Sequence, residues 1–253
     1  MISVIVCSRK EPAFDVHERN VAATVGCEHE YVRIDNRDRE GGIGRAYNEG
    51  VRRAAGDVLV FMHEDAFFME PLWGPSLERK FSEHADVGLV GVAGTQYLDT
   101  EDLRWHSAGK PFVRGRVVHD LPHRDIFALT VFSWDRNDAE VVAVDGLFFA
   151  VRASLFESIS FDEERFDGFH FYDLDICMQV REVARCIATW DLLIKHFSEG
   201  KNDRSWHEAA SRFREKYADR LPASCVEGTP GPGKRDGAEN YDLRGKAPRV
   251  VIV

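Results

Sequence analysis

The sequence predicts an α/β protein built on a mostly parallel β-sheet flanked by helices, as in Rossmann-like folds. Short apolar runs at residues 2–7, 31–34, 58–62 and 87–93 are separated by helical patterns, which is the order of β-α-β units. The run at 58–62 is apolar at every position, as is typical of a strand covered on both faces. In such sheets the functional side chains collect at the carboxyl ends of the strands.

The composition of the chain excludes several classes of function. A chain of 253 residues with 44% apolar residues can form one large α/β domain or two small ones. The net charge of −10 argues against non-specific nucleic-acid binding and against a polybasic membrane contact. No signal peptide is recognisable, and no apolar run approaches the ~20 residues of a membrane helix. Five cysteines without a CxxC pair indicate reduced thiols and a cytoplasmic location.

The first two strands end in polar loops. Residues 2–7 form a β-branched run that reads as a buried strand, and Pro12 suits the first turn of the helix that follows. Residues 31–34 read as the second strand, which ends at Asp35. The linker at 40–44 is rich in glycine, but it has neither the dinucleotide-binding nor the P-loop spacing.

The next segment runs from a helix through a strand into a polar tripeptide. Apolar residues from Gly44 onward have the spacing of a helix core, while Asn48 lies in mid-helix without a local reason. The strand at 58–62 then runs into His63-Glu64-Asp65. On an extended backbone His63 and Asp65 point one way and Glu64 points the other. The tripeptide is either a solvated acidic turn or part of a site.

The middle of the chain is harder to interpret. A helix is expected over residues 71–84 and a buried strand over 87–93. Residues 95–140 carry scattered aromatic and histidine side chains, which would fit hairpins, a mobile lid or an oligomer contact. The aromatic rings either stack on sugars or form a small satellite core.

The second half of the chain predicts two more strand regions and two helices. A strand over 140–151 is interrupted at Asp145-Gly146, which suggests a bulge or a close backbone approach. A final strand over 187–197 contains His196, and an amphipathic helix follows over 204–217.

Residues 161–181 contain two aspartates at the start of a predicted helix. Asp173 and Asp175 are ~200° apart around a helix axis, so they cannot share a face. We expect one of them to face the site and the other to cap the helix or meet solvent.

The composition changes near residue 221. Residues 1–220 are expected to form the α/β domain, and the Gly- and Pro-rich stretch within 221–253 reads as a linker or tail. The apolar end at 250–253 would either add a strand or begin a second domain that this chain lacks.

Three stretches resemble a known family, and the third of them is the segment 196–200, which resembles the family's late histidine motif. The run from Gly44 through Asp57, followed by an apolar strand and an acidic tripeptide, resembles the signature of inverting family 2 glycosyltransferases with the GT-A fold. Residues 161–181 resemble the acceptor-side motif of the same enzymes. The chain is also similar to a "glycosyltransferase-like" subfamily that includes a streptomycin-biosynthesis protein. It departs from the pattern twice, with His63 in place of the first Asp and Tyr172 in place of a Glu.

The resemblance implies roles for particular residues. Asp173 matches the catalytic base, with Asp175 as a second catalytic candidate. Asp65 matches a metal-binding Asp, and His196 and His63 are the other candidate metal ligands. The candidates for nucleotide-sugar binding are Ser8, Arg9, Glu11, Asp35, Arg45, Asn48, His63, Glu64 and Asp145.

The function implied is inverting transfer of a sugar from a nucleotide-diphosphate sugar, most readily a UDP-sugar, to a carbohydrate or small-molecule acceptor. A divalent cation, Mn²⁺ or Mg²⁺, would assist at the diphosphate. One alternative is a GT-A-like scaffold without activity, which would follow if Asp65, Asp173 and His196 did not converge on one cleft. The other alternative, a sugar-phosphate nucleotidyltransferase, would need a glycine-rich activating loop after the first strand, which residues 7–12 lack.

Overall fold

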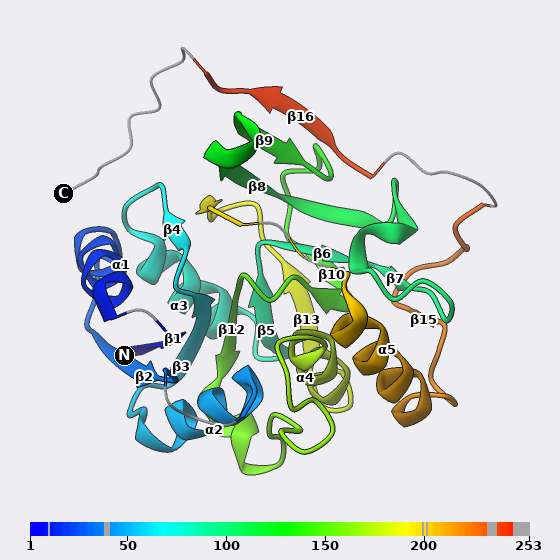
Figure 1. Cartoon of the computed structure of the whole chain (residues 1–253), viewed down its shortest axis with the longest axis horizontal. Helices are drawn as coiled ribbons and strands as arrows, with labels where there is room; N and C mark the ends of the chain where they lie inside the picture. The colour runs from blue at the N-terminus through cyan, green and yellow to red at the C-terminus, as the bar shows by residue number, and fades with distance from the viewer. Residues whose placement is uncertain (10, 38–40, 199, 201, 232–236, 245–253) are drawn as a thin grey trace.

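A computed structural model describes residues 1–253 except 10, 38–40, 199, 201, 232–236 and 245–253. The side chains of residues 11 and 12 also lie outside the described part. In this part of the chain, two seven-stranded β-sheets, one two-stranded sheet and five α-helices make up the fold (Figure 1).

The main sheet has seven strands in the order β10-β13-β5-β12-β3-β1-β2. Strands β2, β1, β3, β5 and β13 run in one direction, whereas β12 and β10 run in the other. The predicted mostly parallel α/β architecture is therefore confirmed. The strands are β1 (Ile2–Ser8), β2 (His29–Asp35), β3 (Val58–His63), β5 (Val87–Gly91), β12 (Phe148–Arg152), β13 (Arg185–Ala188) and β10 (Ala139–Val141).

Helices cover both faces of this sheet. Alternation along the strands sends Ile5 to one core and Val4 and Val6 to the other, so each face buries its own apolar cluster. Helices α2 (Ile43–Arg53), α4 (Tyr172–Val180) and α5 (Arg204–Lys216) pack into the first cluster. Helices α1 (Glu11–Thr24) and α3 (Trp73–Glu83) pack into the second.

A second sheet lies above the carboxyl ends of the central strands (Figure 1). Its order is β11-β6-β8-β14-β4, and β9 joins β8 to β16. The hairpin of β8 and β9 confirms one of the possibilities for residues 95–140. The strands are β4 (Ala66–Phe68), β6 (Ala93–Thr95), β8 (Val113–Leu121), β9 (Ile126–Val131), β11 (Ala143–Val144), β14 (Ile194–His196) and β16 (Glu239–Asp242).

Two predicted single strands are each divided between the sheets. Residues 140–151 form β10, β11 and β12, because the chain crosses to the second sheet at Ala143 and returns through Asp145-Gly146. Residues 187–197 likewise form β13 in the main sheet and β14 in the second. Apolar runs predict burial in both cases, but they do not reveal which neighbour each strand pairs with.

The segment after residue 220 contributes to the same body. Strand β15 (Ala223–Ser224) pairs with β7 (Tyr97–Leu98), and β16 pairs with β9 in the second sheet. The apolar residues 250–253 lie outside the described part of the chain, so the domain division at about residue 220 stays a prediction.

Hydrophobicity along the helices bears on membrane association. Within the described residues, none of the helices has both the length and the apolar character that crossing a bilayer requires.

Candidate active site

Three side chains of the types that can bind a metal ion meet where β3 ends. His63 is the last residue of β3, Asp65 follows in the turn before β4, and His196 ends β14, which pairs with β4. His63 Nδ1 lies 3.4 Å from His196 Nε2, and His196 Nε2 lies 3.3 Å from Asp65 Oδ1. One ligand atom from each residue falls within 4.8 Å of the others. The pairing of β14 with β4 thus joins residues 131 to 133 positions apart.

The electrostatics of this cluster suit a cation. Burial, followed by the nearby charge of His196, lowers the pKa of His63 to about 4, so its imidazole is neutral at neutral pH. Burial acts to raise the pKa of Asp65, but its hydrogen bond with His196 and its other interactions in the cluster together outweigh burial and hold that pKa below the usual range. A neutral imidazole and an ionised carboxylate are the forms that bind metals. Two imidazoles and one carboxylate therefore fit a divalent ion of the first transition row, including Mn²⁺.

A second group of polar side chains begins at Tyr172, the first residue of α4. Its hydroxyl lies 2.7 Å from His63 Nε2 and 3.1 Å from the carbonyl oxygen of Gly146. The adjacent Asp173 accepts hydrogen bonds from the N–H groups of Gly146 and Leu174, both at 2.9 Å. Gly146 therefore contacts both Tyr172, whose hydroxyl meets His63, and Asp173, the candidate base.

The surroundings of Asp173 favour the protonated form of its carboxylate. Burial, with the nearby carboxylate of Asp145 as the second cause, raises the pKa of Asp173 to about 7. In the described part of the chain its hydrogen-bond donors are backbone N–H groups and no basic side chain. A general base works best when its pKa lies near the working pH.

Asp145 is fixed in the same neighbourhood. Its Oδ1 accepts from the Leu147 N–H at 2.9 Å, and its Oδ2 accepts from Trp105 Nε1 at 2.9 Å. The predicted interruption of the 140–151 strand at Asp145-Gly146 therefore places these two residues in the wall of the cleft.

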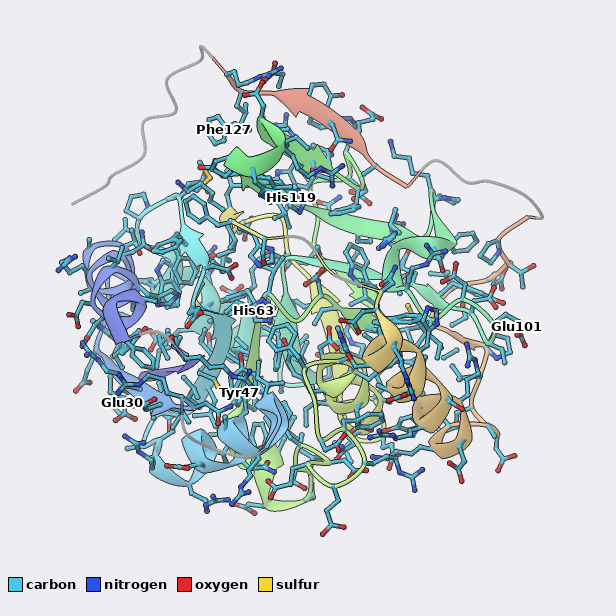
Figure 2. All side chains as sticks on the ribbon, viewed as in Figure 1. Glu30, Tyr47, His63, Glu101, His119 and Phe127 are labelled. Atoms are coloured by element: carbon cyan, nitrogen blue, oxygen red, sulfur yellow. The ribbon has the colours of Figure 1, made fainter. Side chains whose placement is uncertain are left out.

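These groups line a single cleft of about 1090 Å³ between the two sheets. His63, His196 and Asp173 are all on its wall, and Asp65 reaches the same cluster. Figure 2 shows His63 near the middle of the molecule, with His119 above it on β8. The condition that would have favoured an inactive scaffold, a failure of Asp65, Asp173 and His196 to converge, is not met.

Asp175 lies on the opposite side of α4. It is fully buried, accepts a hydrogen bond from Tyr217 at 2.7 Å and forms an ion pair with Lys216 at 2.7 Å. The expectation that the second aspartate caps the helix or meets solvent is wrong, because α5 covers it. Asp175 is not among the residues that line the cleft.

Two of the nucleotide-binding candidates lie at the neighbouring strand ends. Ser8 on β1 stands beside Asp35 on β2 in the parallel register, and Cys7 stands beside His63. Ser8 is buried, whereas Asp35 is exposed and forms an ion pair with Arg37. These residues share the sheet edge of the cluster without lining the cleft.

The remaining candidates are more scattered. Arg9 and Arg45 are exposed, and Glu64 lies on the far side of the tripeptide, where its charge acts on Tyr31. Glu11 begins α1, but its side chain lies outside the described part of the chain.

Asn48 has a structural role in the fold. Its amide donates to Phe161 O at 2.8 Å and to Glu163 at 2.7 Å, and it accepts from the Phe161 N–H at 3.0 Å. The amide therefore ties α2 to the loop that precedes α4.

Sequence reasoning did not place several aromatic and histidine residues of the cleft. Phe169 is 55% exposed and its ring lies 5.1 Å from that of His63. His119 is paired in register with His196, and its Nδ1 lies 2.8 Å from Thr130 Oγ1. Trp105 and His119 belong to the 95–140 segment, whose pairing with distant strands leaves no local periodic signal.

Comparison with known families identifies one match. A family model described as "Glycosyltransferase like family" matches residues 3–219. A curated protein of Fuscovulum blasticum, described as "ATP synthase subunits region ORF 6", is 24% identical over an alignment of 209 residues that covers 79% of this chain and 76% of that protein.

Solved glycosyltransferase structures share the fold at low identity. S. aureus TarS 1–349 in complex with UDP-GlcNAc superposes with a TM-score of 0.56 and 15% identity, covering 89% of this chain and 68% of that one. GalNAc-T7 with UDP, GalNAc and Mn²⁺ gives 0.56 and 10%, covering 86% and 48%. The mannosyltransferase PcManGT from Pyrobaculum calidifontis with GDP-Man and Mn²⁺ gives 0.51 and 14%, covering 89% and 65%. This chain thus spans about half of GalNAc-T7 and just under two thirds of PcManGT, and the shared fold is that of GT-A glycosyltransferases.

Proposed function

Because this chain belongs to the glycosyltransferase-like family, we propose that it transfers a sugar from a nucleotide-diphosphate sugar to an acceptor hydroxyl, with inversion at the anomeric carbon. A UDP-sugar is the donor we favour, and the acceptor is a carbohydrate or another small molecule. The solved relatives were obtained with UDP, UDP-GlcNAc and GDP-Man, which supports a nucleotide-sugar donor.

In this proposal His63, Asp65 and His196 hold the divalent cation. When bound, the cation would neutralise negative charge on the diphosphate leaving group. The protein prepares the site in two ways: burial keeps His63 neutral, and the hydrogen bond with His196 keeps Asp65 ionised. The relatives that contain Mn²⁺ support a cation of this kind.

Asp173 is the proposed general base. As the acceptor oxygen forms its bond to the anomeric carbon, its proton passes to the Asp173 carboxylate. The bond from that carbon to the diphosphate breaks, and its electron pair leaves with the nucleotide. A single displacement of this kind inverts the configuration and needs no nucleophile from the protein. The backbone N–H groups of Gly146 and Leu174 hold the carboxylate in place.

One observation carries this proposal. The metal-binding cluster at the end of β3 and the aspartate with a pKa near 7 at the start of α4 line the same cleft. A hydrogen-bonded path from His63 through Tyr172 and Gly146 to Asp173 connects them.

Thermal unfolding with UDP, GDP, dTDP and CDP, each with and without Mn²⁺, tests the donor site. A ligand at 100 times its dissociation constant stabilises the folded state by ~2.7 kcal/mol, which raises the midpoint by roughly 5–10 °C for a domain of this size. We expect one nucleotide to give this shift only with Mn²⁺, and the Asp65→Ala variant to lose it.

A matched control separates the site from general charge effects. Asp86→Ala removes an exposed carboxylate that pairs with Arg185 outside the cleft, and it should keep the full shift. If none of the four nucleotides shifts the midpoint, or if the shift is the same without metal and in Asp65→Ala, the proposed donor and cation sites are wrong.

A further inference from the structure

Tyr172 links the two halves of the site through a single hydroxyl. This hydroxyl contacts His63 Nε2 at 2.7 Å and Gly146 O at 3.1 Å, and the side chain is buried. Gly146 in turn donates its N–H to Asp173 at 2.9 Å. The four residues form one continuous hydrogen-bonded path.

Counting protons along this path fixes the state of His63. A tyrosine hydroxyl has one proton to donate. If that proton went to His63 Nε2, the carbonyl of Gly146 would lose the donor that the described residues offer it, and leaving a buried acceptor without a donor destabilises the folded state. If the proton goes to Gly146 O instead, His63 Nε2 carries its own proton and donates it to Tyr172. Only the second arrangement satisfies all three groups.

A protonated Nε2 leaves a lone pair on Nδ1 of His63. This nitrogen faces the cluster, 3.4 Å from His196 Nε2 and within reach of Asp65. In the opposite tautomer Nδ1 would carry a proton, and a protonated ring nitrogen cannot bind a metal.

We propose that Tyr172 is a positioning residue that holds His63 in its Nε2–H tautomer and thereby presents Nδ1 to the divalent cation. This inference rests on the cation site of the proposed function and adds a residue that does not itself touch the metal. Hydrogen-bond partners of this kind set the tautomer and orientation of metal-binding histidines.

The space around Gly146 supports the path. A Cβ atom built at this position would lie 2.3 Å from the Tyr172 hydroxyl and 3.0 Å from Asp173 Oδ2. No side chain larger than that of glycine fits there without moving one of the two. The close approach that lets one residue serve both Tyr172 and Asp173 therefore requires glycine.

The contact between His63 and Tyr172 also relates the two positions at which this chain departs from the family 2 motif. Those enzymes have Asp where this chain has His63 and Glu where it has Tyr172, and here the two replacements touch each other. An imidazole N–H needs an acceptor, and a hydroxyl supplies one while it donates elsewhere.

Nitrogen NMR of the metal-free protein, with ¹⁵N-labelled histidine, tests the tautomer directly. We expect His63, assigned by its loss in His63→Ala, to carry its proton on Nε2 in the wild-type protein. Tyr172→Phe should convert it to a mixture of tautomers. A proton on Nδ1 of His63 in the wild-type protein would overturn the inference without the need for any variant.

Metal affinity is the second readout. Each protein is titrated with Mn²⁺ alone, and free Mn²⁺ is measured by electron paramagnetic resonance. Tyr172→Phe should bind Mn²⁺ 10–100-fold more weakly than the wild-type protein. Tyr47→Phe is the matched control, because Tyr47 is also fully buried and its hydroxyl donates to Met62 O at 3.4 Å rather than to His63. The control should bind Mn²⁺ as the wild-type protein does.

The possible failures are distinguishable. If wild-type protein does not bind Mn²⁺, or if His63→Ala and Asp65→Ala leave the affinity unchanged, the cation site of the proposed function is wrong and this inference falls with it. If binding depends on His63 and Asp65 but Tyr172→Phe matches Tyr47→Phe, only the role of Tyr172 is wrong.

Discussion

Helix α4 carries two aspartates, Asp173 and Asp175, whose side chains have opposite electrostatic surroundings on the two sides of the helix. Asp173 faces the cleft, where its donors are two backbone N–H groups and its charged neighbour is another carboxylate, Asp145. Asp175, two residues later, faces α5, where Lys216 and Tyr217 contact its carboxylate. One aspartate is stabilised by an opposite charge, and the other is kept in surroundings that disfavour its ionised form.

This contrast shows that two aspartates of one helix turn can have opposite surroundings, because one faces the cleft and the other faces α5. Burial without a neighbouring cation favours the protonated form of a carboxylate, as it does at Asp173. Helix α4 therefore carries one carboxylate that anchors it to α5, Asp175, and one that lines the cleft, Asp173, which we propose as the general base. The variants below test this division, starting with the largest expected effect.

Replacing Asp173 should remove the chemistry and keep the donor. In Asp173→Asn we expect kcat for sugar transfer to fall by about 10²–10⁴, because the variant has no carboxylate to take the proton of the acceptor. The midpoint shift with nucleotide and Mn²⁺ should persist. Loss of that shift together with activity would mean that Asp173 builds the donor site instead.

The pH dependence should follow the raised pKa of Asp173. Because the base acts in its ionised form, kcat/KM should rise with pH and level off above about 7, and at pH 5 it should be about 100-fold below the plateau. Rates measured between pH 5 and 9 at saturating Mn²⁺ check this. A flat profile through pH 7 would contradict the assignment.

The same pKa affects stability with the opposite sign. The folded protein holds this proton up to about pH 7, whereas the unfolded chain releases it near pH 4. The contribution of Asp173 to the free energy of unfolding is therefore largest below pH 4 and decreases as the pH rises from about 4 to about 7. Comparing urea unfolding of the wild-type protein with that of Asp173→Asn at both pH values isolates this contribution.

Replacing Asp175 should affect folding rather than chemistry. Asp175→Asn removes the charge that Lys216 contacts in a buried setting, and we expect the free energy of unfolding to drop by about 1.5–3 kcal/mol. Lys216 keeps its second partner, Asp162, which limits the loss. Urea unfolding gives the change, and kcat per folded molecule should stay near the wild-type value. A collapse of kcat in a folded variant would return Asp175 to the catalytic candidates.

The smallest effect is expected from the neighbour of Asp173. Asp145→Asn removes a negative charge beside the base, so the pKa of Asp173 should fall and the acid limb of the pH–rate profile should move to lower pH. Because burial is the larger cause of the raised pKa, the limb should move only part of the way toward the ordinary carboxyl range. A limb that stays in place or moves upward would show that Asp145 does not act through its charge.

Local patterns in the sequence predict the parts of the fold that depend on local signals. The apolar run of β3, the helical spacing of α2 and the polar end at His63 are all visible within a few residues. The second sheet is not predictable in this way, because β8 pairs with β6, β9 and β14, and β9 pairs with β16 more than 100 residues away.

The residues of the candidate site also differ in whether a local sequence signal predicts them. Strand ends predict that His63, Asp65 and His196 are polar residues at a sheet edge, and the family resemblance adds their role. Helix phase separates Asp173 from Asp175, but the position of α5 decides which one is covered. The contact of His63 with Tyr172 joins residues 109 apart and leaves no trace in either local sequence.

The family match ends at residue 219, but the wall of the cleft continues beyond it. Asn240, Asp242 and Arg244, on β16 and just after it, line the cleft, and β16 reaches this place through its pairing with β9. The metal cluster and Asp173 lie on elements inside the matched region. A substitution on β16 would therefore change the outer wall of the cleft without replacing any residue of the His63, Asp65 and His196 cluster or Asp173.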